Sequence, residues 1–297
     1  MIAEVNRIGV WMTAGAKAKA FAEMLKFRLS LLVAFSCAFG FVLASGELNW
    51  FKLVMLFAGG FLLSGASIVI NQIKEKEYDK LMTRTMNRPL PTGRVSVQEA
   101  MVFGTICAVA AIVILMVFTN PLTTLLSIVS MILYSFVYTP LKRVGPIAVF
   151  VGAIPGALPP LLGWTAATGV ISHEALIIFG IQFIWQFPHF WAIAWVADED
   201  YKKAGFKLLP SGGTRDINTA IQIMVYTMFL IPFGLLPATF GITGINSAVV
   251  ATVCGVLFFA QTFSLMRTGD RRSALKIMFG SFLYLPVVQI AFLLDKV

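Results

Sequence analysis

The sequence predicts an all-α fold, a polytopic helical bundle that crosses a membrane nine times. Hydrophobic residues make up 58% of the 297 positions and charged residues only 12%, too few to cover a water-soluble surface of ordinary composition. The apolar residues fall in long runs separated by short charged stretches. We therefore expect residues 1–297 to form a single intramembrane domain whose main solvent is lipid.

Each apolar run is long enough to cross the ~30 Å hydrocarbon layer at ~1.5 Å per residue of helix. The predicted spans are residues 27–46, 51–73, 97–118, 121–141, 146–166, 175–197, 219–239, 246–266 and 273–294. The fifth span contains Pro155, Pro159 and Pro160, which leave carbonyl groups without their helical donors. We expect a broken helix there, either as a packing kink or as the wall of a cavity.

The basic residues predict the orientation, because Lys and Arg are retained on the cytoplasmic side. All of the 23 Lys and Arg residues except Lys52 and Lys296 fall on one side of the predicted spans. That side includes the N-terminal segment 1–26, with Arg7, and the longest charged loops, 74–96 and 198–218. The sequence therefore predicts a cytoplasmic N-terminus, an outside C-terminus and working loops that face the cytoplasm.

The net charge of +9 follows from this topology, so the expected partner is membrane lipid and not nucleic acid. Cys37, Cys107 and Cys254 lie inside predicted spans without CxxC spacing, which indicates apolar packing rather than disulfides or metal ligands. The N-terminus has neither a signal-peptide pattern nor the Arg and Ser content of a mitochondrial presequence, which favours a bacterial plasma (inner) membrane.

An acidic motif follows the second predicted span. Asn71, Glu75 and Asp79 lie at positions i, i+4 and i+8, which places them in one stripe about 12 Å long on a helix. Amide and carboxylate oxygens are the ligands that Mg²⁺ prefers, and Mg²⁺ commonly shares substrate phosphates. The stripe is therefore suited to a metal-diphosphate site, but the interleaved lysines are at least as typical of a solvated, salt-bridged helix.

Two arginines, Arg84 and Arg88, lie one helical turn apart just downstream. Paired guanidinium groups suit phosphate oxygens by their planar, bidentate geometry. Anchoring to lipid headgroups is the alternative that needs no substrate.

A second acidic cluster, Asp198, Glu199 and Asp200, ends the sixth predicted span. Adjacent carboxylates repel one another, and the negative end of the helix dipole disfavours them further. A bound cation resolves both costs, whereas two independent solvated acidic faces are the competing interpretation. Since both acidic clusters lie on the same side of the membrane, we favour one shared metal-diphosphate site.

His189 lies inside the sixth predicted span, in the stretch WQFPHFW. An ionisable residue at membrane depth is a functional candidate by default. It is suited to bind haem iron, to act as a base, or to hydrogen-bond to another helix. The neighbouring aromatic residues, Trp191 among them, suit a flat aromatic ligand, although such residues more often serve packing. His173, by contrast, falls in an outer loop.

These residues resemble a known family. NQIKEKEYD, RTMNRPLP and YTPLKR are similar to motifs of the UbiA-type intramembrane prenyltransferases, in which two acidic motifs bind Mg²⁺ and an isoprenyl diphosphate. WQFPHFWAIAW at 185–195, EDYKKAGFKLLP at 199–210 and PGALPPLLGW at 155–164 resemble, more narrowly, the protohaem farnesyltransferases (haem O synthases). The matches extend from residue 26 to 285.

The resemblance implies that farnesyl diphosphate and haem b are the substrates and that haem O passes to a haem A synthase or to terminal oxidase assembly. It further implies that Mg²⁺ is held by Asn71, Glu75, Asp79 and Asp200, helped by Glu199; that the diphosphate is neutralised by Arg28, Arg84, Arg88 and Lys142; and that haem, or the water that adds to it, is positioned by His189, with Trp191 beside the haem.

Two positions depart from the family pattern. Glu75 stands where Asp is frequent, which lengthens the ligand arm but keeps the charge. Lys26-Phe27-Arg28 stands where Lys-Pro-Arg is common, so we expect a less sharply bent entry to the first span. Two other functions compete with haem farnesylation, namely prenylation of a quinone precursor or other aromatic, and secondary transport. Transport predicts ionisable groups near the middle of the bilayer.

Overall fold

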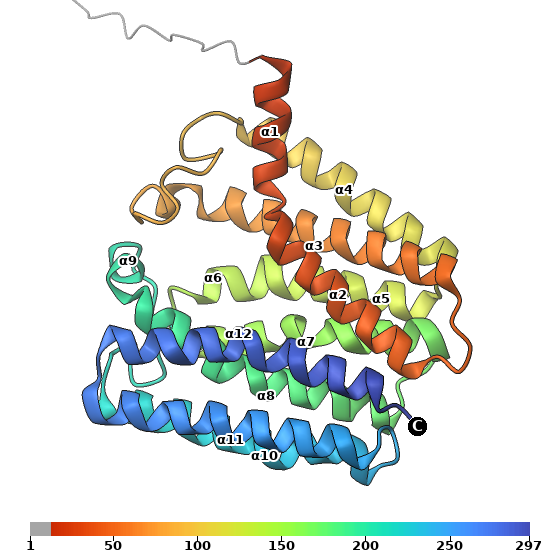
Figure 1. Cartoon of the computed structure of the whole chain (residues 1–297). Helices are drawn as coiled ribbons and strands as arrows, with labels where there is room; N and C mark the ends of the chain where they lie inside the picture. The colour runs from red at the N-terminus through yellow and green to blue at the C-terminus, as the bar shows by residue number, and fades with distance from the viewer. Residues whose placement is uncertain (1–12) are drawn as a thin grey trace, which may run out of the picture.

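The computed structural model describes residues 13–297, which are helical apart from connecting turns and one isolated β-bridge (Figure 1). Arg7 and the start of the predicted N-terminal segment lie outside the described residues. The nine predicted spans are confirmed within residues 13–297. They are α2 (Phe27–Ala44), α3 (Trp50–Asp79), α4 (Val97–Phe118), α5 to α6 (Pro121–Leu141), α7 (Ile147–Thr168), α8 (His173–Val196), α10 (Ile217–Thr239), α11 (Ile245–Thr268) and α12 (Arg271–Leu294).

The spanning helices lie side by side, so their connections gather at two ends of the bundle (Figure 1). One end, called the basic end below, carries residues 25–26, 80–96, 142–146, 197–216 and 269–270. The opposite end carries residues 45–49, 119–120, 169–172, 240–244 and 295–297. Among the described residues, Lys52 and Lys296 are the basic residues at the opposite end.

Helix α1 (Ala14–Met24) lies at the basic end and fixes the 80–96 segment. Arg94 pairs with Glu23 at 2.8 Å, and Lys17 pairs with Glu99 at 2.7 Å, at the start of α4. Ser96 begins α4 with a capping box, in which its hydroxyl accepts from the Glu99 amide. The long 80–96 segment is thereby held between α1 and α4.

A left-handed residue joins α1 to α2. Lys26 has φ +45°, and it is the one non-glycine residue of segment 13–297 with positive φ. That conformation costs an L-residue roughly 1–2 kcal/mol. The expectation of a gentle entry to the first span is therefore wrong: the chain turns abruptly at Lys26 although proline is absent from the next position.

Helix α3 extends beyond the predicted second span, to Asp79. The sequence placed residues 74–79 in the loop because they are charged, but they continue the same helix. As a result the Asn71, Glu75 and Asp79 side chains stand on a rigid element, at the spacing that puts them on one face.

The predicted interruption of the fifth span is wrong, because α7 runs through Pro155, Pro159 and Pro160. The packing kink stays a prediction, and Trp164 of this helix does line a cavity, at the opposite end. Pro160 has no N–H for the carbonyl of Gly156, and the side-chain amide of Gln182 donates to that oxygen instead, at 2.9 Å. Hydrogen bonds from a neighbouring helix replace the missing backbone donor, which is how proline is tolerated inside a membrane helix.

Helices α2 and α7 cross closely through glycines. A Cβ on Gly40 would lie 2.0 Å from the Pro160 carbonyl oxygen, and one on Gly163 would lie 1.9 Å from the Cys37 carbonyl oxygen. Glycine is therefore required at both positions for this backbone contact, as is common where membrane helices approach closely.

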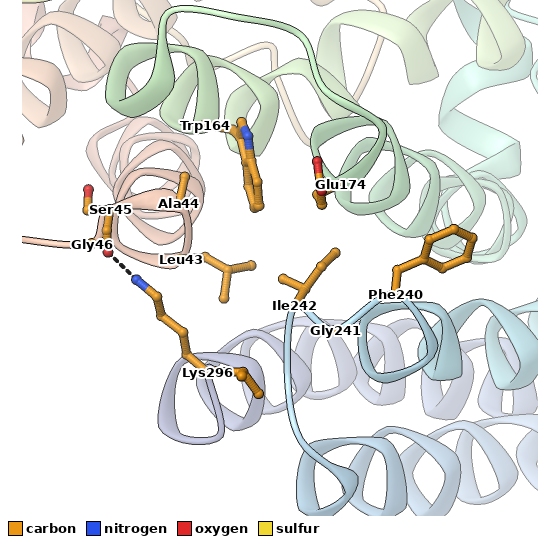
Figure 2. Close-up of a pocket in the computed structure, with 11 residues that line it drawn as sticks. Leu43, Ala44, Ser45, Gly46, Trp164, Glu174, Phe240, Gly241, Ile242 and Lys296 are labelled. Carbon is orange, nitrogen blue, oxygen red and sulfur yellow. Dashed lines mark hydrogen bonds between the residues drawn. The ribbon is translucent and has the colours of Figure 1, made fainter.

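Residues after the last helix close the opposite end. Lys296 Nζ donates to the carbonyl oxygens of Val42, at 3.0 Å, and of Ser45, at the end of α2. Figure 2 shows the bond to Ser45. Asp295 accepts from the Ser247 backbone amide at 2.6 Å, at the start of α11. A cavity of about 280 Å³ lies beside this contact, lined largely by apolar side chains together with Glu174 and Lys296.

Candidate active site

A smaller cavity, of about 120 Å³, lies at the basic end and is strongly polar. It is lined by Lys26, Asn71, Glu75, Asp79, Met82, Arg84, Arg88, Tyr134, Lys142, Tyr201, Phe206 and Leu208. The predicted acidic stripe and three of the predicted diphosphate-binding residues therefore share one cavity. The larger cavity at the opposite end contains none of them, so we assign the chemistry to the smaller one.

The acidic stripe of α3 is buried and charge-paired. Glu75 Oε1 accepts from Lys142 Nζ at 2.8 Å, and Asp79 Oδ2 accepts from an Arg88 guanidinium nitrogen at 2.7 Å. The second oxygen of Asp79, Oδ1, is buried and finds no hydrogen-bond partner among the described residues. A fully buried carboxylate oxygen without a partner is costly, which favours a cation at this position.

Asn71 is oriented by Thr139, which directly follows a π-helix, η1 (Leu133–Tyr138), that the sequence did not reveal. Its Nδ2 donates to Thr139 Oγ1 at 2.9 Å, and Thr139 Oγ1 in turn donates to the Tyr134 carbonyl at 2.9 Å. Since the Thr139 hydroxyl proton is engaged, that hydroxyl must accept from the Asn71 amide. The Asn71 carbonyl oxygen is consequently left free as a ligand, and π-helical turns often mark functional sites.

Lys142 follows the one-turn helix α6 (Thr139–Leu141) and reaches into the cavity. Its ammonium lies 4.7 Å from the ring centroid of Tyr138 and 5.8 Å from that of Phe206. These aromatic rings and Glu75 hold the charge in place.

The second acidic cluster begins a new helix, α9 (Asp198–Lys203), which starts directly after α8 ends at Val196. Asp198, Glu199 and Asp200 lie in its first turn, where the helix dipole favours negative charge. The prediction that these carboxylates sit unfavourably at a helix C-terminus is therefore wrong. Their position at a helix start needs no cation to explain it.

Asp200 connects this cluster to the 80–96 segment. Its Oδ2 accepts from the Arg84 backbone amide at 3.1 Å, and its Oδ1 accepts from Lys203 Nζ at 3.1 Å. Burial raises the pKa of Asp200, but the Arg84 and Lys203 hydrogen bonds outweigh that effect and lower the pKa to about 2. The Arg84 guanidinium also donates to the Tyr201 hydroxyl at 3.2 Å, and both of these residues line the cavity. Asp200 itself is absent from the cavity lining.

Glu199 and Arg28 do not join the cavity. The Glu199 side chain is 85% exposed, and its ion-pair partner is Arg215 at 3.8 Å. Arg28 is exposed and is absent from the cavity lining. Within residues 13–297, no three His, Cys, Asp or Glu side chains gather as one metal site. The carboxylates alone therefore do not form a metal site, and substrate oxygens would have to complete it.

Sequence reasoning missed Lys26, which lines the cavity from the left-handed joint before α2. Burial, followed by repulsion from Arg88, Arg84 and Lys142, lowers the pKa of Lys26 to about 7. An anion in the cavity offsets this repulsion and favours the charged amine. The available signal was a lysine directly before the first apolar run. The prediction of a diphosphate-binding residue instead named Arg28, two residues later.

His189 is buried on α8, apart from the polar cavity. Its Nδ1 lies 2.8 Å from Ser281 Oγ on α12, and its ring stacks on Trp185 with centroids 4.4 Å apart. Trp191 packs instead against Tyr226 of α10, at 5.0 Å. Residues two apart on a helix point to nearly opposite sides, so the structure does not bring Trp191 beside His189.

Known proteins resemble this chain over most of its length. Residues 33–285 match the model of the UbiA prenyltransferase family. A protoheme IX farnesyltransferase of Cytophaga hutchinsonii is 52% identical over 280 residues, covering 94% of this chain and 98% of the relative. The protoheme IX farnesyltransferase of Flavobacterium psychrophilum is 44% identical over 284 residues, covering 93% and 94%.

Two solved structures share the fold. A digeranylgeranylglyceryl phosphate synthase superimposes with a TM-score of 0.78 at 20% identity, covering 94% of this chain and 98% of the other. A UbiA homologue from Archaeoglobus fulgidus bound to GPP and Mg²⁺ gives 0.64 at 16% identity, covering 93% and 99%. From the family match and the near full-length relatives, the chain belongs to the UbiA prenyltransferase family.

Proposed function

We propose that the protein transfers the farnesyl group of farnesyl diphosphate to a vinyl group of haem b, with addition of water, to give haem O and diphosphate. The polar cavity carries this proposal, because it combines buried carboxylates with a ring of cations above an apolar bundle. The relatives named protoheme IX farnesyltransferase, at up to 52% identity over nearly the whole chain, support haem as the acceptor.

The residues present fit Mg²⁺. Asp79 Oδ1 is buried without a partner among the described atoms, and the Asn71 carbonyl oxygen is free. We propose that these oxygens hold Mg²⁺ together with Glu75 and Asp200, while Glu199 remains in solvent. When bound, Mg²⁺ would neutralise the charge that develops on the departing diphosphate.

Four cations would hold the diphosphate oxygens, namely Lys26, Arg84, Arg88 and Lys142. Arg88 and Lys142 pair with Asp79 and Glu75, respectively. We propose that both cations turn from the carboxylates to the diphosphate, which frees carboxylate oxygens for the metal. This exchange keeps the buried charges compensated throughout, and an uncompensated buried charge is strongly destabilising.

The chemistry then forms one carbon–carbon bond and breaks one carbon–oxygen bond. The allylic C–O bond of farnesyl diphosphate breaks, and its electron pair leaves with the diphosphate. The vinyl π electrons form the new bond to farnesyl, water adds to the remaining carbocation, and the water's proton is released. Preorganised cations at the cavity lower the barrier to diphosphate departure, and apolar side chains below it exclude stray water. His189 would position the haem.

The setting is proposed from charge. The basic end faces the cytoplasm of a bacterial plasma membrane, by the excess of Lys and Arg at that end. Haem O carries an apolar farnesyl chain, so its transfer to a haem A synthase or to terminal oxidase assembly would follow the bilayer.

The test is incubation of purified protein with haem b, farnesyl diphosphate and Mg²⁺, followed by mass analysis of the porphyrin. We expect farnesylated haem, its loss on chelation of Mg²⁺, and its loss in Asp79→Asn with retained folding. Prenylation of a phenol with unmodified haem would establish the aromatic-acceptor alternative. Binding of farnesyl diphosphate without any product would favour transport. The position of the buried carboxylates counts against transport, because they lie at the basic end and not near the middle of the bilayer.

A further inference from the structure

His189 and Ser281 form a hydrogen-bonded unit that the polar cavity does not use. His189 is one of only two histidines in the sequence, and the other, His173, has a side chain 69% exposed at the opposite end. Both His189 and Ser281 are buried, on α8 and α12 respectively. A buried histidine between membrane helices is expensive to place and is a functional candidate.

The hydrogen bonds fix which nitrogen of His189 carries the proton. Ser281 Oγ donates its single proton to the Met278 carbonyl at 2.6 Å. That hydroxyl must therefore accept the bond from His189 Nδ1, at 2.8 Å, so Nδ1 bears the hydrogen. The lone pair is left on Nε2. A histidine that binds a metal through one nitrogen almost always donates its other N–H in this way.

Aromatic rings hold the imidazole plane. Trp185 stacks on His189 with an interplanar angle of 19°, and Phe190 and Phe282 meet it edge-on at 5.1 and 5.0 Å. Trp185 Nε1 also donates to the Ser281 carbonyl at 3.0 Å, which ties the stacking ring to the same turn of α12. The imidazole is therefore fixed in plane, tautomer and direction before any ligand arrives.

The face of α8 that carries His189 looks between α7 and α12. Gln182 lies on the same face, two turns earlier, and it bonds to Gly156 of α7 and to Gln289 of α12. His189 lies seven residues before the end of α8, or roughly 10 Å along the helix, and Asn71 lies eight residues before the end of α3, or roughly 12 Å. Both residues thus lie nearer to the basic end of their helices than to the opposite end.

We infer that Nε2 of His189 is the axial ligand of the haem iron and that Ser281 is a positioning residue that fixes its tautomer. The inference rests on the proposed function for the identity of the metalloporphyrin. A neutral imidazole with a free Nε2 is the ordinary protein ligand of haem iron.

The test is a haem b titration of the purified full-length protein, followed by the absorption spectrum of the bound haem. We expect His189→Ala to lose the histidine-ligated spectrum and exogenous imidazole to restore it, while His173→Ala, the matched control, keeps it. Ser281→Ala should raise the haem Kd about 10- to 100-fold, as loss of a supporting hydrogen bond does at metal sites. Ser281→Thr, which keeps the hydroxyl, should bind like the unchanged protein.

A wild-type spectrum in His189→Ala, or its loss in His173→Ala, would overturn the ligand assignment. Equal haem affinity in Ser281→Ala and the unchanged protein would overturn the positioning role. Size-exclusion profiles of every variant separate loss of ligation from loss of folding. Because haem binding is measured without farnesyl diphosphate, a protein that shows the expected spectra yet makes no farnesylated haem refutes the proposed function alone.

Discussion

The backbone amide of Arg84 donates to the Asp200 carboxylate at 3.1 Å, across 116 positions of sequence. Through this bond the start of α9 holds the 80–96 segment, and with it the Arg84 side chain, against the cavity. The second acidic cluster is thus connected to the segment that follows the first cluster, and this connection does not depend on a shared metal.

Replacement of Asp200 by Ala should raise the KM for farnesyl diphosphate about 10- to 100-fold. A hydrogen bond to a charged group is worth about 1.5–3 kcal/mol, and each 1.4 kcal/mol is tenfold. Steady-state kinetics would measure this KM. Glu199→Gln is the matched control and should leave the KM unchanged, because that side chain is exposed. An equal loss in Glu199→Gln would place Glu199 in the site after all.

Lys26 and Arg28 make a second matched pair, two residues apart. Lys26→Met should raise the KM for farnesyl diphosphate about tenfold or more, because its amine lies in the cavity with Arg84 and Arg88. Arg28→Met should change it less than about twofold, since Arg28 is exposed outside the cavity. The reverse order of effects would contradict the placement of Lys26.

Thr139 should matter for metal affinity because it orients Asn71. In Thr139→Val the hydroxyl that accepts from the Asn71 amide is lost, and the free amide no longer holds its oxygen toward the cavity. We expect the Mg²⁺ concentration for half-maximal activity to rise about tenfold, the lower range for supporting residues of metal sites. Thr139→Ser should restore it. Binding of Mn²⁺ with inorganic pyrophosphate, followed by electron paramagnetic resonance, should shift in parallel; an unchanged affinity would refute the orienting role.

Gly40→Ala should destabilise the bundle by about 1–3 kcal/mol or more, because its Cβ would lie 2.0 Å from the Pro160 carbonyl and the two backbones must separate. Thermal unfolding in detergent measures this. Gly46→Ala is the control, since nothing of the described chain lies within 4 Å of a Cβ there. Similar stability of both variants would show that α2 and α7 can move apart freely.

The spans were predictable because the length and apolarity of a segment are enough to identify a membrane helix. Two local features could not be predicted from the sequence. Three prolines in α7 predicted a break, but Gln182, a residue 22 positions after Pro160, supplies a donor for one of the freed carbonyls. The acids at 198–200 were assigned to a helix end, and a break at a single residue, Ala197, makes them a helix start.

Within the site, side-chain types and helical spacing identified Asn71, Glu75 and Asp79 on one face. The ion pairs that neutralise them were not visible, because Lys142 lies 67 positions from Glu75 in sequence. Lys26 was overlooked because its direction depends on a left-handed backbone that lysine rarely adopts. Propensity describes what a residue usually does, and here the tertiary packing overrode it.

The contact between Lys296 and the end of α2 has a consequence for assembly in the cell. The first spanning helix enters the bilayer long before the residues that hold its far end have been synthesised. Until all the later spans are in place, nothing from the ninth span's tail can cap the Val42 carbonyl. The contact between the first spanning helix, α2, and the residues after α12 must therefore form after all the spans between them have been synthesised.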